Sequence, residues 1–326
     1  MQRDPPPPDA QHAACDSLDA LLGHELLLVT GKGGVGKSTL AAILARAAAG
    51  AQKRVLLLEF ESVSRVAPLF GGQPVGADAR QVAPHIWAQS LTAMDSLRYF
   101  ATRQLKVPAL VHLALRNKAV DGFFKASPAV RPALFLYQLW RTVEEHGPRG
   151  DRHWDLIICD LPTSGFVAGM YAIPNMLAGV FRTGPIATYA DGMRAMLRDA
   201  ARTGLTIVTL PEDMPVVEAL ELRAFLRERH GVEVAAVVLN AVMQRALEPE
   251  VLAALDRAAD DSAALAGWKR TADRVADRRG KAVAAAARLR SDLPPGALLS
   301  LPWRSERELA LPAIDALVGR LREGVI

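Results

Sequence analysis

The chain has 326 residues and half of them are hydrophobic, which is enough for one large α/β domain or two smaller ones and excludes disorder over most of the length. Its 39 lysines and arginines against 35 acidic residues permit an anionic ligand or surface and indicate nothing more specific. Cys15 and Cys159 lie far apart, so neither a disulfide framework nor a zinc site is indicated. We therefore expect a globular protein of a reducing compartment, the cytoplasm.

Residues 1–23 are predicted to form a disordered leader, and residues 24–326 the folded domain. The leader holds four consecutive prolines and lacks the apolar core of a signal peptide. Residues 161–181 carry no charge and are long enough to span a bilayer. Their prolines and glycines, and their fusion to a strand ending in Asp160, instead favour a buried segment of a soluble protein. An integral membrane protein is not expected.

Short apolar runs alternate with helical periodicity, which predicts βα units and a mostly parallel sheet flanked by helices. The stretch TGKGGVGKST, residues 30–39, between the first strand and a helix makes this an α/β fold of the P-loop NTPase type. The predicted strands, in chain order, are 25–31, 54–60, 154–161, 205–211, 232–240 and 297–302.

The connection between the second and third predicted strands is too long for a simple crossover. Its prolines divide it into three predicted helices, so residues 90–150 are expected to form an inserted helical subdomain. These helices are 91–105, 108–124 and 131–146. A second helical block is predicted over 249–292, and a closing helix over 306–323.

The stretch TGKGGVGKST, residues 30–39, satisfies the P-loop pattern between the first strand and the helix predicted over 37–49. Its glycines free backbone N–H groups for phosphate oxygens, and the helix N-terminus adds partial positive charge. We expect Lys37 to bridge the β- and γ-phosphates, Ser38 to ligate Mg²⁺ and Thr39 to reach the α-phosphate. The residues expected to bind ATP here are Gly31, Gly33, Gly34, Val35, Gly36, Lys37, Ser38 and Thr39.

Asp160 ends an apolar strand, where a carboxylate can hold a Mg²⁺-bound water, so Ser38 and Asp160 are the predicted metal residues. The following loop, residues 162–165, is flexible enough to sense the γ-phosphate. The alternative is a strand-terminating aspartate that caps a helix.

Lys32 is not needed to hold phosphates in its own subunit. The run KGGVGKS resembles the signature of the deviant P-loop ATPases, a class that includes chromosome-partition, septum-site, nitrogenase-iron and arsenite-efflux ATPases. The resemblance implies a dimer with ATP at its interface, in which Lys32 reaches the partner's phosphates and stabilises transition-state charge. The alternative is a solvated loop lysine.

Other segments narrow the resemblance to the arsenite-efflux and tail-anchored-protein-targeting ATPase family. They are DLPTSG, the run TLPEDMPVVEALELRAFL with Glu218, VVLNAV with Asn240, and LPWRSE with Pro302. The family implies that Asn240 reads adenine, that the loop around Pro302 closes over it, and that the inserted helices bind a client. An E-x-E pattern at Glu59 and Glu61 is most similar to bacterial members that occur as two paralogues, so the expected partner is a second copy or a paralogous ATPase.

The sequence also departs from the family's pattern at residues that bear on catalysis. Glu61 stands where the family has an aspartate that orients the attacking water, and Phe166 replaces a histidine. A longer carboxylate can still act through water, so we expect Glu61 to be catalytic and hydrolysis to be slow or partner-dependent. The alternative is a surface carboxylate on a weak subunit. The cysteines that bind zinc or arsenite in the family are absent, which disfavours arsenite transport.

Apolar residues in the inserted block exceed what one face of each helix needs. Packing in a core or dimer interface is the favoured interpretation, and a groove for a hydrophobic peptide or membrane-protein client is the alternative.

Residues 268–290 are rich in arginine and lysine, which most simply indicates a solvated helix face. An anionic patch would favour a second function, a partition- or septum-site-like ATPase that binds DNA or a membrane surface when dimerised by ATP. Nucleic acid is not the expected partner.

Overall fold

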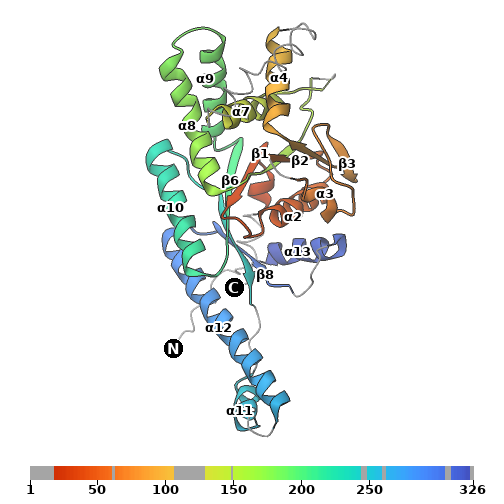
Figure 1. Cartoon of the computed structure of the whole chain (residues 1–326), viewed down its shortest axis with the longest axis vertical. Coiled ribbons are helices and arrows are strands. Elements are labelled where there is room, and N and C mark those ends of the chain that lie inside the picture. The colour runs from red at the N-terminus through yellow and green to blue at the C-terminus, as the bar shows by residue number, and fades with distance from the viewer. Residues whose placement is uncertain are drawn as a thin grey trace, which may run out of the picture.

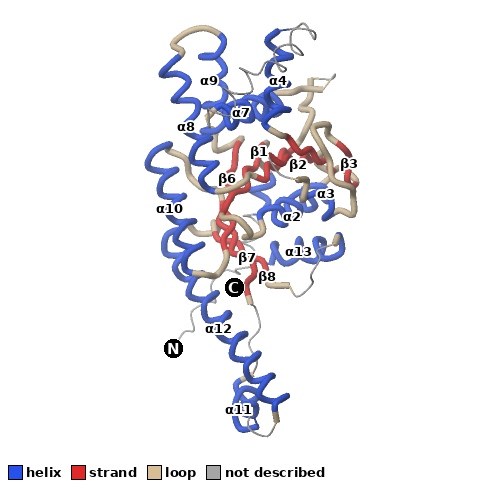
Figure 2. The backbone as a smooth tube through the Cα atoms, in the orientation of Figure 1, coloured by secondary structure: helices blue, strands red, loops and turns tan. Residues whose placement is uncertain are grey.

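The computed structural model describes residues 18–60, 63–105, 129–147, 150–243, 248–258, 262–304 and 310–323. Its centre is an eight-stranded sheet with the strand order β3-β4-β2-β5-β1-β6-β7-β8 (Figures 1 and 2). Every neighbouring pair is parallel except β3 and β4. The predicted fold class, a mostly parallel α/β sheet flanked by helices, is confirmed.

All six predicted strands are present, with ends shifted by a few residues. They are β1 (Leu26–Gly31), β2 (Val55–Phe60), β5 (Leu156–Asp160), β6 (Thr203–Thr209), β7 (Ala236–Val242) and β8 (Leu298–Pro302). Every residue of β1, β2 and β6 is buried. Helices cover both faces of the sheet, so these strands are buried along their whole length and do not alternate between core and solvent, although β6 carries three threonines.

Two strands were missed in the connection after β2, ahead of the helices of the insertion predicted over 90–150. β4 (Ile86–Leu91) adds to β2 in parallel, and β3 (Arg80–Ala83) returns antiparallel at the sheet edge. The turn between them uses His85 at φ 62°, and the pairing contains an irregularity between Gln81 and Ala83. The short edge strand and the turn without glycine give none of the usual hairpin signals.

The helices form a layer on each face of the sheet. On one face, Leu27 and Val29 of β1 share a core with three helices, α2 (Lys37–Gly50), α3 (Val66–Leu69) and α13 (Leu311–Glu323). The alternate residues Leu26 and Leu28 face the second layer, as the two-residue period of a strand requires. That layer contains α7 (Val130–Val143), α8 (Ser164–Val180), α9 (Pro185–Arg198), α10 (Asp213–His230) and α12 (Ala263–Asp292).

The described part of the predicted insertion consists of α4 (Ala93–Leu105) and α7, which pack on each other. The helix predicted over 108–124 lies outside the described residues. Phe135, Leu136 and Leu139 of α7 are fully buried in the core on the face of the sheet to which Leu26 and Leu28 point. α7 therefore covers the sheet directly as well as packing on α4.

The predicted leader boundary at residue 23 is wrong. Residues 18–22 form a helical turn, and Leu18, Leu21 and Leu22 are at most 5% exposed in the core that also holds Leu27 and Val29. Three leucines at helical spacing bury apolar surface that would otherwise face water, so the fold includes them. Residues 1–17 lie outside the description.

Most of the charge-free run 161–181 forms α8, and the predicted burial holds for one face of this helix but not for its carboxyl-terminal end. Met170 and Ile173 face the core, but Met176, Val180 and Phe181 are 46%, 70% and 39% exposed at the helix end. In Figure 1, α8 and α9 form a hairpin at the top of the view. No helix in the described ranges is long and apolar enough to cross a membrane.

The second predicted helical block is confirmed as α11 (Pro249–Ala258) and the 30-residue α12. The Ser262 hydroxyl accepts a hydrogen bond from the Leu265 N–H and caps α12. Figure 1 shows the first half of α12 extending away from the sheet, with α11 packed at its far end.

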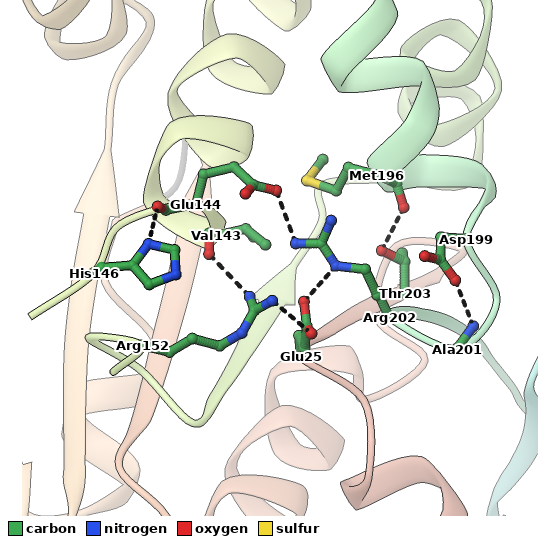
Figure 3. A network of polar contacts seen from close by, with 10 residues as sticks. All are labelled: Glu25, Val143, Glu144, His146, Arg152, Met196, Asp199, Ala201, Arg202 and Thr203. Carbon is green, nitrogen blue, oxygen red and sulfur yellow. Dashed lines mark hydrogen bonds and ion pairs between the residues drawn. The ribbon is translucent and has the colours of Figure 1, made fainter. Parts of the chain in front are cut away.

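A network of ion pairs joins the amino-terminal ends of the strands (Figure 3). Arg202, before β6, lies 2.6 Å from Glu25 and 2.8 Å from Glu144. Arg152, before β5, lies 2.7 Å from the other oxygen of Glu25. The network thus ties β1, β5, β6 and the end of α7 together, at the opposite edge of the sheet from the P-loop.

Candidate nucleotide site

The P-loop lies at the carboxyl-terminal edge of the sheet, between the end of β1 at Gly31 and the start of α2 at Lys37. β5 and β6 are the neighbours of β1, and β7 is next to β6. Open parallel sheets bind ligands at this edge, where several strand ends and helix N-termini converge. The sequence-predicted site residues of the described chain gather here.

Gly31, Gly34 and Gly36 have positive φ, and at two of them another segment also comes too close for a side chain. Gly31 has φ 147°, and a Cβ atom there would lie 2.3 Å from the Val208 carbonyl oxygen. Gly36 has φ 97°, and a Cβ atom would lie 2.2 Å from Nδ2 of Asn240. No atom of another described segment lies within 4 Å of the Cβ positions at Gly33 and Gly34, so that stretch of the loop is open. The loop backbone is therefore tightly packed on one side and accessible to a phosphate on the other.

Lys37 begins α2 and is half-buried. Its ammonium group donates a hydrogen bond to the Lys32 carbonyl oxygen at 3.1 Å. Burial lowers the pKa of Lys37, the carboxylate of Asp160 opposes that shift, and the positive charge of Arg65 adds to it. An anion in the loop would relieve the cost of burying this cation.

Ser38 and Asp160, the predicted metal residues, are brought together. The Ser38 hydroxyl lies 2.5 Å from Oδ2 of Asp160, while Oδ1 is buried and has no hydrogen-bond partner in the part of the chain that the structure describes. Burial raises the pKa of Asp160, and Ser38, Lys37 and Arg65 oppose that shift. A hydroxyl and a carboxylate beside a phosphate site are the oxygen ligands that Mg²⁺ takes when it keeps several waters. The orphaned Oδ1 atom fits such a hydrated cation.

Glu59 is a second buried carboxylate at this edge. It is 1% exposed and pairs in register with Asp160 on the neighbouring strand. Oε1 accepts hydrogen bonds from the N–H groups of Arg65 and Val66, and Oε2 is buried with no partner of hydrogen-bonding geometry among the described residues. Burial raises the pKa of Glu59. Sequence reasoning treated it only as part of the E-x-E pattern, although a carboxylate inside an apolar strand is a signal of its own. The predicted catalytic residue Glu61 lies outside the described residues.

Lys32 leaves the loop in another direction from Lys37. Its ammonium nitrogen lies 2.6 Å from Oε1 of Glu218 on α10. The two side chains are 45% and 33% exposed, so this is a surface ion pair. The sequence singled out both residues, Glu218 through a family segment, but did not predict that they pair.

Asn240 fastens β7 to the P-loop. Its Nδ2 donates to the Val35 carbonyl oxygen at 2.8 Å, and its Oδ1 accepts from the Ala241 N–H at 2.8 Å. Each group keeps one more hydrogen-bonding valence, a second hydrogen on Nδ2 and a second lone pair on Oδ1. The amide is therefore held in a fixed orientation and can still present a donor and an acceptor to the edge of a base.

Pro302 ends β8 opposite Val242, and the next residue, Trp303, is 43% exposed. Trp303 and Ala241 line a cavity of about 710 Å³ at this end of the sheet. The loop after β6 and the basic face of α12 complete its wall, with Leu210, Pro211, Arg274, Arg278 and Lys281 among the lining residues. The cavity has the size of a small-molecule site and lies on the Asn240 side of the P-loop.

Phe166 occupies the position at which the family has a histidine. It contacts Phe60 of β2 and Phe135 of α7, with ring centroids 5.3 Å and 6.0 Å away. Phe60 and Phe135 are themselves stacked at 4.2 Å. Here the residue packs the first turn of α8 against the sheet, directly after the loop that follows Asp160.

A strand, a glycine-rich loop, a helix with lysine and serine at its start, and a carboxylate on the adjacent strand define a P-loop nucleotide-binding protein. Residues 26–266 match the family CbiA, described as the CobQ/CobB/MinD/ParA nucleotide binding domain. The chain belongs to this family.

Curated relatives carry ATPase names. ATPase BagA of Mycobacterium tuberculosis is 28% identical over 239 residues, 72% of this chain and 69% of the relative. An arsenical pump-driving ATPase of Halobacterium salinarum is 24% identical over 231 residues, 66% of this chain and 35% of the relative. ATPase ASNA1 homolog 1 of Paramecium tetraurelia is 25% identical over 154 residues, 46% of this chain and 44% of the relative. These similarities support ATPase activity at a general level.

Proposed function

We propose that the chain binds ATP with Mg²⁺ and hydrolyses it as a nucleotide-gated dimer in the cytoplasm, with Lys32 of each subunit acting on the other subunit's ATP. The observation that carries the proposal is the divergence of the two loop lysines. Lys37 stays against the loop, whereas Lys32 extends to Glu218 on the exposed surface. One lysine is thus available to the subunit's own phosphates and the other to a neighbour.

Within one subunit the roles follow from position. The loop amides and Lys37 bind the phosphates, and Ser38 and Asp160 hold the metal. When bound, Mg²⁺ neutralises charge on the phosphate oxygens. Glu61 orients the attacking water, and its length relative to aspartate makes turnover slow or dependent on the partner. Asn240 recognises the adenine edge, with Pro302 beside it.

The experiment is to measure molar mass and turnover of the full chain with ATP–Mg²⁺, ADP–Mg²⁺ and no nucleotide. We expect a dimer with ATP, a shift toward monomer with ADP, and phosphate release that rises with protein concentration. Lys37→Ala is the matched control because it removes the phosphate-binding cation in the same loop. Turnover by a species that is monomeric at every concentration would contradict the proposal. If the chain alone is inactive, the same assay with a paralogous ATPase from the same cell tests the heterodimer.

An apolar groove supports a hydrophobic peptide or membrane-protein segment as the client. A cavity of about 520 Å³ lies between the start of α7 and α8, lined by residues that include Pro132, Phe166, Ile173 and Met176. Gly165 is part of its wall and lies at the start of α8, directly after the loop that follows Asp160. A change of that loop with the bound nucleotide can therefore change the shape of the groove. Crosslinking of an apolar helical peptide should differ between ATP and ADP, and equal crosslinking would count against a switched groove.

The second candidate, DNA or membrane-surface binding, is weakened by pairing on α12. Lys269 lies 2.7 Å from Asp256 and 2.6 Å from Asp273, and Lys281 lies 2.9 Å from Asp277. Paired lysines gain less from phosphate groups than free ones, because the existing partner must be displaced. We expect no ATP-dependent binding to DNA or anionic vesicles at low salt. Salt-steep binding gained only with ATP would favour the second candidate.

A further inference from the structure

Arg65 lies at the start of α3, on the phosphate side of the sheet edge. Its backbone N–H donates to Glu59 at 2.7 Å, and Glu59 is the register partner of Asp160. α3 packs against α2, the helix that begins at Lys37, and Val66 and Ala67 are buried in the core they share. The backbone of Arg65 is therefore fixed relative to the P-loop by a buried carboxylate and by helix packing.

The strand order gives the nucleotide a direction along the edge. β7, which carries Asn240, lies on one side of β1, and β5 and β2, which carry Asp160 and Glu59, lie on the other. With the base at Asn240 and the first phosphates in the P-loop, the terminal phosphate lies toward β5 and β2. Arg65 follows β2 and is thus at the γ-phosphate end.

The guanidinium group of Arg65 is exposed and makes no hydrogen bond or ion pair with any described residue. Its charge nevertheless reaches the site: burial lowers the pKa of Lys37 and Arg65 adds to that shift, while burial raises the pKa of Asp160 and Arg65 opposes the rise. A cation that has no ion-pair partner within the described ranges raises the positive potential around Lys37, an arrangement that costs free energy until an anion binds.

We propose that Arg65 is a second cationic ligand of the terminal phosphate, supplied by the same subunit, so that one subunit distinguishes ATP from ADP before it meets its partner. The proposal rests on the nucleotide-binding part of the proposed function and not on the dimer. A planar guanidinium can donate two parallel hydrogen bonds to phosphate oxygens, which lysine cannot do. Arg65 would thus select the triphosphate within its own subunit, whereas Lys32 would act on the nucleotide of the other subunit.

The test compares ATP and ADP affinities of the full chain, measured by calorimetry with Mg²⁺ at a protein concentration that keeps it monomeric. In Arg65→Ala we expect ATP affinity to fall roughly 10- to 100-fold, with ADP affinity changed less than about 3-fold. Arg65→Lys should recover part of the ATP affinity, because lysine restores the positive charge but cannot donate the two parallel hydrogen bonds of a guanidinium group. Arg80→Ala, which removes an exposed arginine from the edge strand β3, is the matched control and should match wild type.

An unchanged ATP-to-ADP affinity ratio in Arg65→Ala would overturn the inference, whether both affinities stay at wild-type values or fall together. A thermal melt separates misfolding from a binding effect, since α3 is part of the core. Failure of wild type to bind either nucleotide would instead overturn the proposed function, so the two failures are distinguishable.

Discussion

The ammonium group of Lys32 lies 2.6 Å from the carboxylate of Glu218, although the two residues are 186 positions apart in the chain. The pair joins the P-loop to α10 on the molecular surface. A lysine that is to act on a neighbouring subunit must first leave this partner. In the proposed dimer, breaking the pair between Lys32 and Glu218 would add to the cost of dimerisation.

Glu218→Gln tests this cost. Exposed ion pairs contribute about 0–1 kcal/mol, so the free energy of unfolding should change by less than about 1 kcal/mol. ATP-dependent dimerisation should tighten by up to roughly 5-fold for each pair released. Sedimentation with ATP–Mg²⁺ measures the dimerisation. The control is Glu221→Gln, which changes an exposed glutamate on the same helix. Weaker dimerisation in Glu218→Gln would mean that Glu218 is itself needed in the dimer.

Two glycine substitutions separate binding from stability. Gly36→Ala places a Cβ atom 2.2 Å from Asn240 at a positive φ, so ATP affinity should fall by more than roughly tenfold. Gly192→Ala places a Cβ atom 2.4 Å from the Trp140 ring between α9 and α7. Overpacking there should cost about 1–2 kcal/mol of unfolding free energy with unchanged ATP affinity. Calorimetry and urea unfolding check both variants; equal effects on binding would show that the loop geometry is not the determinant.

The network of Figure 3 stabilises the fold away from the nucleotide. Arg202→Met removes both contacts of Arg202 and leaves Glu144 without this partner, so we expect a loss of about 1–2 kcal/mol. Arg98→Met, which removes a 3.8 Å surface pair, should cost less than about 0.5 kcal/mol. Urea unfolding measures both. ATP affinity should match wild type in each, and a selective loss in Arg202→Met would show coupling between the two sheet edges.

Glu59 predicts a pH dependence of stability. Burial raises its pKa above the ordinary value of 4.5, so the folded state holds the proton more tightly than the unfolded state. The resulting stabilisation is complete below the unfolded pKa and is lost as the pH rises through the raised folded pKa. The unfolding free energy of wild type minus that of Glu59→Gln should therefore fall as the pH rises above 4.5. Urea unfolding at a series of pH values measures it, and a constant or rising difference would contradict the burial effect.

The sequence was sufficient for the centre of the site because the motif itself fixes local geometry. Ser38 and Asp160 were predicted together, since a P-loop helix and an adjacent strand end must meet at one edge of a parallel sheet. The buried apolar strands were equally clear. Their ends shifted by a few residues because flanking residues such as Val232 and Val234 are buried without joining the ladder.

Contacts between distant segments were beyond sequence reasoning. The hydrogen bond from Asn240 to Val35 and the pairing of Lys32 with Glu218 depend on how loops meet after the sheet has formed. Phe166 was read as a missing histidine, and only its contacts with Phe60 and Phe135 show what replaces it. The burial of Leu18 in the core was missed because composition alone was used to place the leader.

The most direct test of the central claim mixes two inactive variants, Lys32→Ala and Lys37→Ala. A mixed dimer contains one site with an intact Lys37 from the first variant and an intact Lys32 from the second, provided that Lys32 acts across the interface. Equal mixing should therefore restore ATP turnover to about a quarter of the wild-type rate, because half of the dimers are mixed and each has one complete site. If Lys32 acts within its own subunit, no dimer has a complete site, and a mixture as inactive as its components would contradict the account.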